Sequence, residues 1–98
     1  MNKEIQAKQG MILKQFQSLP SIGKAGSLDL WNMGFRSIDE LKGKNPMELY
    51  EKLCYITKLK HDICVLYSFR CMVYFVNEKE HEKEKLNWWY WKDKTYNE

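Results

Sequence analysis

The sequence predicts an all-α domain of about five helices. Through most of the chain, apolar residues recur at spacings of three and four, which is the period of an amphipathic helix. Short clusters containing proline, glycine or asparagine separate these segments. The 98 residues suffice for one domain with its own core, and 44% hydrophobic with 14% aromatic residues exclude a disordered chain.

The first helix is expected to begin firmly near Met11, because Gly10 weakens the turns before it. Pro20 ends this helix, since proline restricts the residue that precedes it. A second helix is predicted from Lys24 to Gly34, where the glycine is suited to a C-terminal cap.

Capping signals predict three further helices. Ser37 and Glu40 have the spacing of a capping box for a short helix. The Asn45-Pro46 pair has the residues of an N-cap and a first helical position. Asp62 can cap a helix over 63–76, although this apolar run would also suit a buried strand. Its length and its cap favour a helix.

The C-terminal part combines a charge run with tryptophans. Residues 78–85, EKEHEKEK, are expected to form a solvated helix extension or loop. Trp88, Trp89 and Trp91 follow, and a disordered tail has no reason to hold three tryptophans, so we expect this segment to pack back on the helices. Stacking on single-stranded bases is the alternative role for these rings.

Charge and hydropathy indicate a cytoplasmic protein without a membrane contact. Sixteen Lys and Arg against thirteen Asp and Glu give a net charge of +3, which does not identify a polyanion partner. The first six residues lack the apolar run of a secretory signal. The longest apolar stretch, 63–76, is shorter than the roughly 20 residues of a membrane span.

Isolated polar residues have mainly structural interpretations. Arg70 lies in the most apolar segment and needs a partner, and we expect Asp62 or Asp93, with a stack on a tail tryptophan as the alternative. His61 beside Asp62 is no acid–base pair, because adjacent residues seldom face each other. No phosphate-loop, zinc-protease or esterase motif occurs, so we expect no enzymatic activity.

The three cysteines are an odd number without a C-x-x-C pair, which indicates free thiols. On one helix Cys64 and Cys71 would lie about 10 Å apart along the axis, too far to share a zinc ion. A metal site would require Cys54, Cys64 and His61 to converge. We therefore expect buried, inert thiols and no metal or cofactor.

Residues 19–23, between the first two helices, resemble a helix-hairpin-helix motif. A tight turn of this kind points the amides at the start of the second helix outward, where they and the helix dipole suit a phosphate oxygen. Lys24 would add a positive charge to the same phosphate. Ile22 is expected to insert between the two helices.

A second, degenerate copy of the motif is predicted at residues 42–45, Lys-Gly-Lys-Asn. We expect the two turns to pair and contact successive phosphates. The candidate nucleic-acid-binding residues are therefore Ser21, Ile22, Gly23, Lys24, Lys42, Gly43 and Lys44. The predicted organisation is a single domain over 1–98, with a paired helix-hairpin-helix unit over 11–57, a central buried helix over 61–77, and a charged linker with a Trp-rich segment over 78–98.

From Leu19 onward the chain resembles the small bacterial pathogenicity-locus family. The residues that carry the resemblance include Leu19-Pro20, Ile22-Gly23, Leu30, Gly34, Ser37-Ile38, Gly43, Pro46, Leu49-Tyr50, Leu53-Cys54, His61-Asp62, CVLYSFRC at 64–71 and WWYWKD at 88–93. The resemblance implies an all-helical, SAM-like helix-hairpin-helix fold and nucleic-acid binding, with no established reaction.

Two functions are open at this point. The first is non-specific binding of the DNA backbone through the paired turns, with a Kd of about 10⁻⁴–10⁻⁶ M that rises with salt. The alternative is a helical adaptor for protein–protein interaction that keeps the fold without the phosphate site. Ser21 at the usual position of a hairpin glycine, Gly26 inside the second helix and the near-balanced charge favour the adaptor. The sequence makes no prediction of oligomeric state.

Overall fold

The computed structural model describes residues 3–98, and helices are the regular secondary structure in this range. The four α-helices are α1 (Lys3–Gln17), α2 (Lys24–Asn32), α3 (Pro46–Thr57) and α4 (Ile63–Asn77), and the three 3₁₀ helices are η1 (Ile38–Leu41), η2 (Lys83–Leu86) and η3 (Trp88–Asp93). The predicted all-α class is confirmed. None of these helices is long and apolar enough to cross a bilayer.

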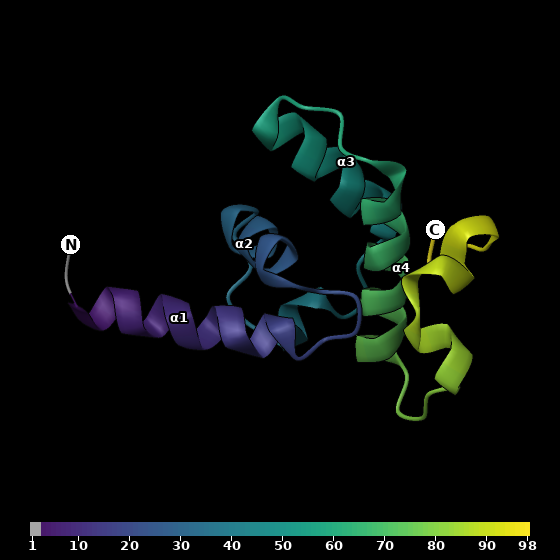
Figure 1. Ribbon diagram of the computed structural model, residues 1–98, viewed down its shortest axis with the longest axis horizontal. Coiled ribbons are helices and arrows are strands. Elements are labelled where there is room, and N and C mark those ends of the chain that lie inside the picture. Colours follow the sequence, from purple (N-terminus) through teal and green to yellow (C-terminus); the bar gives the residue numbers. More distant parts are fainter. Residues whose placement is uncertain (1–2) are drawn as a thin grey trace.

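Helix α4 is the central element of the molecule. Figure 1 shows it between the other α-helices on one side and the C-terminal segment on the other. Its side chains of Leu66, Phe69, Met72 and Val73 are at most 2% exposed. Burying an apolar side chain of this size contributes about 1.5–3 kcal/mol. The apolar run in this part of the chain is therefore a helix buried on several sides.

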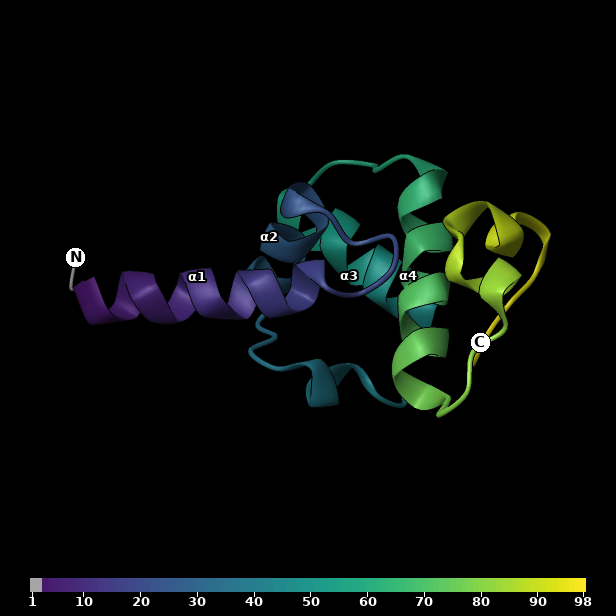
Figure 2. The same cartoon turned by 60° about the horizontal axis from the view of Figure 1, so that its bottom comes forward.

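Helix α1 begins earlier than predicted. It is helical from Lys3, so the expected start near Met11 is wrong. Gly10 lies within the helix, and one interior glycine costs only about 1 kcal/mol relative to alanine. The neighbouring lysines, glutamines and alanine are good helix formers that offset this cost. As a result, the N-terminal half of α1 projects beyond α2 (Figures 1 and 2).

The end of α2 has the glycine cap that the sequence predicts. Gly34 has a φ of +100°, which favours glycine. Its amide donates to the Trp31 carbonyl at 3.0 Å, and the Phe35 amide donates to the Leu30 carbonyl at 3.0 Å. This pair of bonds is the Schellman motif.

The predicted N-terminal caps are also present. Glu40 accepts a hydrogen bond from the Ser37 amide at 2.8 Å, within a capping box at the start of η1. The Asn45 side chain accepts from the Glu48 amide at 3.1 Å, with proline at the first position of α3. Asp62 accepts from an amide of the first turn of α4 at 2.8 Å.

The Trp-rich segment packs against α4, as predicted (Figure 2). Trp91 is 4% exposed, and its indole N–H donates to a backbone carbonyl of η2 at 2.9 Å. Trp88 stacks on Tyr67 of α4, with ring centroids 6.5 Å apart. Trp89 differs, since it is 61% exposed. The charge run before these residues forms a loop and then η2.

Arg70 is buried and paired, but with neither of the expected partners. Its Nε and Nη2 donate to the Glu98 carboxylate at 2.7 and 3.1 Å, and its Nη1 donates to the Trp91 carbonyl at 3.0 Å. The expectation of Asp62 or Asp93 is therefore wrong. Asp62 caps the N-terminus of the same helix, and the C-terminal segment brings Glu98 to Arg70 instead.

Candidate nucleic-acid interface

The first turn, residues 18–23, is closed by backbone hydrogen bonds. The Leu19 amide donates to the Phe16 carbonyl at 3.1 Å, and the Ile22 amide donates to the Leu19 carbonyl at 3.2 Å. Ser21 has a φ of +69°, in the left-handed region that favours glycine. Serine therefore adopts here the conformation for which many hairpins use glycine.

Ile22 has a structural part in the first turn. Its side chain is 6% exposed and lies in the main core cluster, so it is buried as predicted. A Cβ added to Gly26 would meet Ile22 Cγ2 at 3.5 Å, an ordinary van der Waals contact, so Ile22 packs directly over this part of α2. Because both its amide and its side chain are engaged within the fold, Ile22 offers little to a ligand.

The start of α2 presents uncapped amides. Gly23 is the N-cap residue in an extended conformation, and no side chain caps the helix. The amides of Lys24, Ala25 and Gly26 lack an intrahelical acceptor because of their position in the first turn. Gly23, Lys24 and Ala25 are exposed. The buried Ser27 hydroxyl donates to the Lys24 carbonyl at 2.8 Å, which holds this end of α2 in shape.

A small cavity of about 170 Å³ lies beside the first turn, between α2 and α4. Asp29 and Ser68 are among its lining residues. Partial burial raises the pKa of Asp29, and the opposing effect of His61 is smaller. A carboxylate in this cavity disfavours a bound anion, so the anion-binding character of the first turn is confined to the exposed amides of α2.

The second turn, residues 42–45, is closed by side chains from distant parts of the chain. The Gly43 amide donates to Asn77 Oδ1 at 2.9 Å. Asn97 Nδ2 donates to the carbonyls of Gly43 and Lys44 at 3.1 and 2.9 Å. The Lys44 amide donates to the Leu41 carbonyl at 3.3 Å. The amides of Gly43 and Lys44 are thus engaged inside the fold.

The two lysines of the second turn are exposed, with different surroundings. Lys42 Nζ is 3.2 Å from a carboxylate oxygen of Asp39, in a pair that solvent screens. Lys44 Nζ lies 6.0 Å from the ring centroid of Phe35. These side chains supply positive charge, but the turn between them offers no free amide at Gly43.

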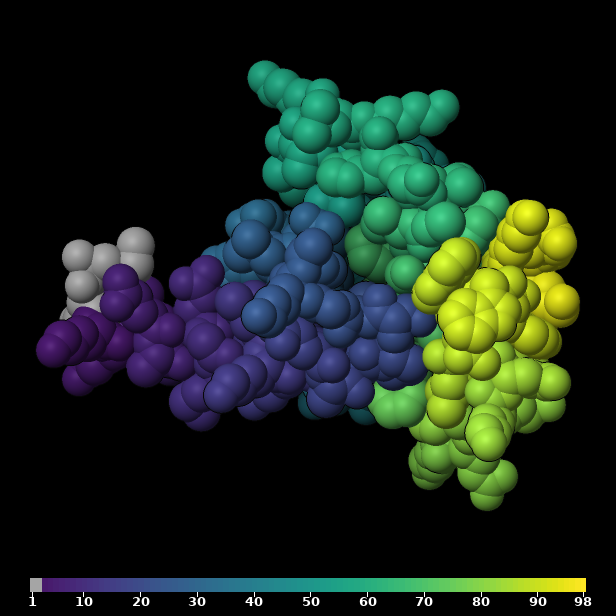
Figure 3. Space-filling model, viewed as in Figure 1, coloured from purple at the N-terminus to yellow at the C-terminus, as the bar shows by residue number. Residues whose placement is uncertain are grey.

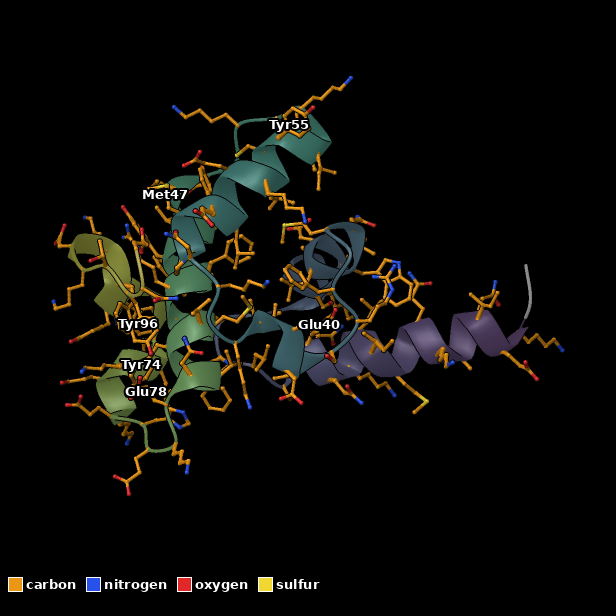
Figure 4. The ribbon with its side chains drawn as sticks, turned by 180° about the vertical axis from the view of Figure 1, so that it is seen from behind. Glu40, Met47, Tyr55, Tyr74, Glu78 and Tyr96 are labelled. Carbon is orange, nitrogen blue, oxygen red and sulfur yellow. The ribbon has the colours of Figure 1, made fainter. Side chains whose placement is uncertain are left out.

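The structure does not bring the two turns together. The first turn lines a cavity with Ser68, whereas the second turn bonds to Asn77, and about 13 Å of helix rise separates these two residues. Figure 3 shows the face of the molecule on which the first turn lies, between α1 and the C-terminal segment. Figure 4, from behind, shows η1 with Glu40 in front of α1. The two predicted sites therefore lie on different sides of the molecule.

Other hollows and clusters have different chemistry. A hollow of about 750 Å³ has three glutamates and two lysines in its wall, which disfavours a phosphate. No group of three or more His, Cys, Asp or Glu in residues 3–98 could hold a metal ion, so Cys54, Cys64 and His61 do not converge. Burial raises the pKa of the Cys71 thiol, which makes it a weaker nucleophile.

Three residues with clear roles near the candidate sites were missed from the sequence. Asn77 and Asn97 close the second turn, and Arg36 lies on the ring of Trp31 with its Cζ 3.5 Å from the ring centroid. Asparagine contacts across 34 and 54 positions leave no periodic signal in a sequence. The C-terminal cap at Gly34 was the available clue that the chain reverses between Trp31 and Arg36.

Residues 9–97 match the family described as Pathogenicity locus. The match includes both turns, α4 and the Trp-rich segment. Neither a curated protein nor a solved structure matches the chain.

Proposed function

The chain belongs to the pathogenicity-locus family, and on that premise we propose that it binds the DNA backbone without sequence specificity, through the first turn. The observation that carries the proposal is the uncapped, exposed start of α2 at Gly23 and Lys24. An α-helix holds roughly half a positive charge at its N-terminus, and its first amides point outward. These are the properties that a phosphate oxygen requires.

Each residue at the start of α2 has a distinct part in the proposed contact. The amides of Lys24 and Ala25 donate to the phosphate oxygens, and the Lys24 ammonium adds a point charge. Gly23 has nothing within 4 Å of an added Cβ, so the backbone is open to close approach. Because such contacts reach phosphate and sugar only, they position the protein on DNA and carry no base information.

The second turn has a smaller part in this proposal than the sequence predicts. Its Gly43 amide is engaged by Asn77, so Lys42 and Lys44 act only as exposed charges. They lie away from the first turn and would contact a different stretch of backbone. With so few phosphate contacts, we expect a Kd of about 10⁻⁴–10⁻⁶ M that rises steeply with salt.

Gly23→Asp separates DNA binding from stability. The new carboxylate accepts from the same amides that the phosphate would use, as aspartate does at many N-caps, so the fold should be at least as stable. The competing carboxylate should weaken binding of a labelled DNA duplex by more than about tenfold in fluorescence anisotropy. Thermal unfolding checks that the fold is retained.

Charge reversals complete the test of the first turn. Lys24→Glu should weaken binding and lower the slope of log K against log salt by about 1, because one phosphate contact is lost. Lys60→Glu is the matched control, an equal charge change at an exposed residue of the connector before α4. The proposal fails if Gly23→Asp leaves affinity unchanged and Lys24→Glu acts no more strongly than Lys60→Glu.

A second candidate function, the adaptor for protein–protein interaction, has its own supporting observation. An apolar groove of about 310 Å³ lies between α1 and the end of α2, lined by three residues of α1 together with Trp31 and Arg36. An apolar groove of this kind is typical of a surface that binds another protein. It uses residues other than those of the first turn, so the two functions are compatible.

A further inference from the structure

We propose that the groove between α1 and α2 is a docking site for an amphipathic helix of a partner protein that carries carboxylates beside its apolar face. This inference rests on the adaptor function and is independent of DNA binding at the first turn. Three observations carry it: the apolar lining of the groove, the sign of its charges and the fixed position of one arginine.

The groove follows one face of α1. It is lined by Ile5, Lys8 and Ile12 of α1, by Trp31 of α2 and by Arg36, which follows the end of α2. Ile5, Lys8 and Ile12 are spaced so that they share one side of the helix. Ile5 is 55% exposed and Ile12 is half-buried, so both side chains are accessible from the groove. Ile5 and Ile12 are seven positions apart, and with Trp31 they form apolar contacts at a spacing that an amphipathic helix can match.

Arg36 is held in place before any partner binds. Its Cζ lies 3.5 Å from the ring centroid of Trp31, and its Nη1 donates to the carbonyls of Trp31 and Phe35 at 2.8 and 2.9 Å. The planar guanidinium is therefore fixed, with the remaining N–H groups left for an acceptor. A positioned guanidinium suits a carboxylate, and its fixed conformation lowers the entropic cost of binding.

The charges of the groove select an acidic partner. Its two charged lining residues, Lys8 and Arg36, are both cations. The nearby Glu40 carboxylate is occupied, because it accepts from the amides of Arg36 and Ser37 at 2.6 and 2.8 Å. These two bonds lower the pKa of Glu40 and keep it at the start of η1. The Arg36 guanidinium also lowers the pKa of Glu40, so its charge is shared with that carboxylate. A partner carboxylate would meet Lys8 and Arg36, the two positive side chains that line the groove.

The apolar patch at the end of α3 of a second copy is a poorer occupant than an acidic helix. The exposed apolar residues at the end of α3, Tyr55 and Leu59, lie beside Lys58 and Lys60 in the sequence. Figure 4 shows Tyr55 at the outer end of α3, pointing away from the body. Lysines next to this patch would repel the cations of the groove, so the patch lacks the complementary charge.

The probe is a labelled, acetylated peptide of about 14 residues, or four helical turns. Leucines at i, i+3, i+4 and i+7 form its apolar face, with glutamates beside them and alanines elsewhere. A matched peptide has lysine in place of every glutamate. Anisotropy titration of the full chain should give an affinity at least about tenfold higher for the acidic peptide. Added salt should reduce this difference.

Variants of α1 locate the binding surface. Ile5→Asp and Lys8→Glu should each weaken binding of the acidic peptide by about fivefold or more. Met11→Asp and Lys14→Glu are the matched controls, since both residues are exposed on α1 but do not line the groove. These controls should bind like the original chain. Circular dichroism checks that α1 remains helical in all four variants.

Three results would overturn the inference. The first is equal affinity for the acidic and basic peptides, and the second is an equal loss in the lining and control variants. The third is self-association of the chain, abolished by Ile5→Asp in sedimentation analysis, which would make a second copy the occupant. Gly23→Asp should leave peptide binding intact, so failure of DNA binding and failure of this inference are distinguishable.

Discussion

Glu98→Gln is expected to destabilise the fold, because it removes the charge that neutralises Arg70. The two side chains are 10% and 9% exposed, and two hydrogen bonds of 2.7 and 3.1 Å join them. Glutamine has nearly the same shape as glutamate and keeps one carbonyl acceptor. The substitution therefore tests the charge of the partner rather than the packing of the segment.

The expected loss follows from what Arg70 retains. Removing one partner of a buried ion pair costs about 3–5 kcal/mol, chiefly because the other charge stays buried. Arg70 keeps its bond to the Trp91 carbonyl at 3.0 Å, and glutamine still accepts one bond. We therefore expect a loss of about 2–3 kcal/mol in the free energy of unfolding. With a urea slope of about 1 kcal/mol per M, the midpoint should fall by about 2–3 M.

Equilibrium unfolding in urea, followed by tryptophan fluorescence, measures this loss. Arg70→Met should lower the free energy of unfolding by less than Glu98→Gln does, because the unpaired Glu98 carboxylate can rotate into the solvent. In the Arg70→Met background, Glu98→Gln should have little further effect. Glu51→Gln, at an exposed residue of α3, should change stability by less than about 0.5 kcal/mol. The reasoning is refuted if Glu98→Gln and Glu51→Gln lower the free energy of unfolding equally. It is also refuted if Glu98→Gln lowers this free energy as much in the Arg70→Met background as in the original chain.

Further predictions concern two glycines, two carboxylates with shifted pKa values and the closure of the second turn. Gly10→Ala should stabilise α1 by about 0.5–1 kcal/mol, because nothing lies within 4 Å of the added Cβ. Gly34→Ala should destabilise the fold by about 1–2 kcal/mol, because the φ of Gly34 is +100°. Thermal unfolding measures both effects. The hydrogen bond from the amide that Asp62 caps lowers the pKa of the Asp62 carboxyl. The stability that this carboxylate contributes is therefore complete above the ordinary value of 3.8 and is lost as pH falls through the folded-state pKa. Asp62→Asn should abolish this pH dependence, measured by urea unfolding at stepped pH. Burial raises the pKa of Asp29, so stability falls as pH rises from 3.8 through the folded-state pKa, and Asp29→Asn should stabilise the fold at neutral pH in the same assay. Asn77→Ala removes the side chain that accepts from the Gly43 amide. Hydrogen exchange of this amide, measured by NMR, should therefore become about fivefold faster.

Helix ends were the most predictable part of this fold. The caps at Gly34, Asn45 and Asp62 all join groups within five positions of one another, so a short window of sequence contains both partners. The predicted start of α1 is wrong because Gly10 is only one residue of the helix. The helix-forming residues around it offset its cost.

The candidate phosphate site was predictable only in its first half. The uncapped start of α2 follows from Gly23, which has no side chain to cap the helix, and from Pro20, which ends the helix before it. At Gly43 the same local pattern has a different outcome, because Asn77 takes its amide. DNA binding at either turn stays a prediction, and the Gly23→Asp variant tests it.

What the residue pattern alone establishes here is local: an all-α chain, where most helices end, and which faces are apolar. These features depend on bonds and spacings within a few positions. The partner of Arg70 depends on a contact across 28 positions, and the closure of the second turn depends on contacts across 34 and 54 positions. Such contacts arise when packing of the C-terminal segment on α4 brings Glu98 and Asn97 to elements far away in sequence, and no periodicity encodes that choice.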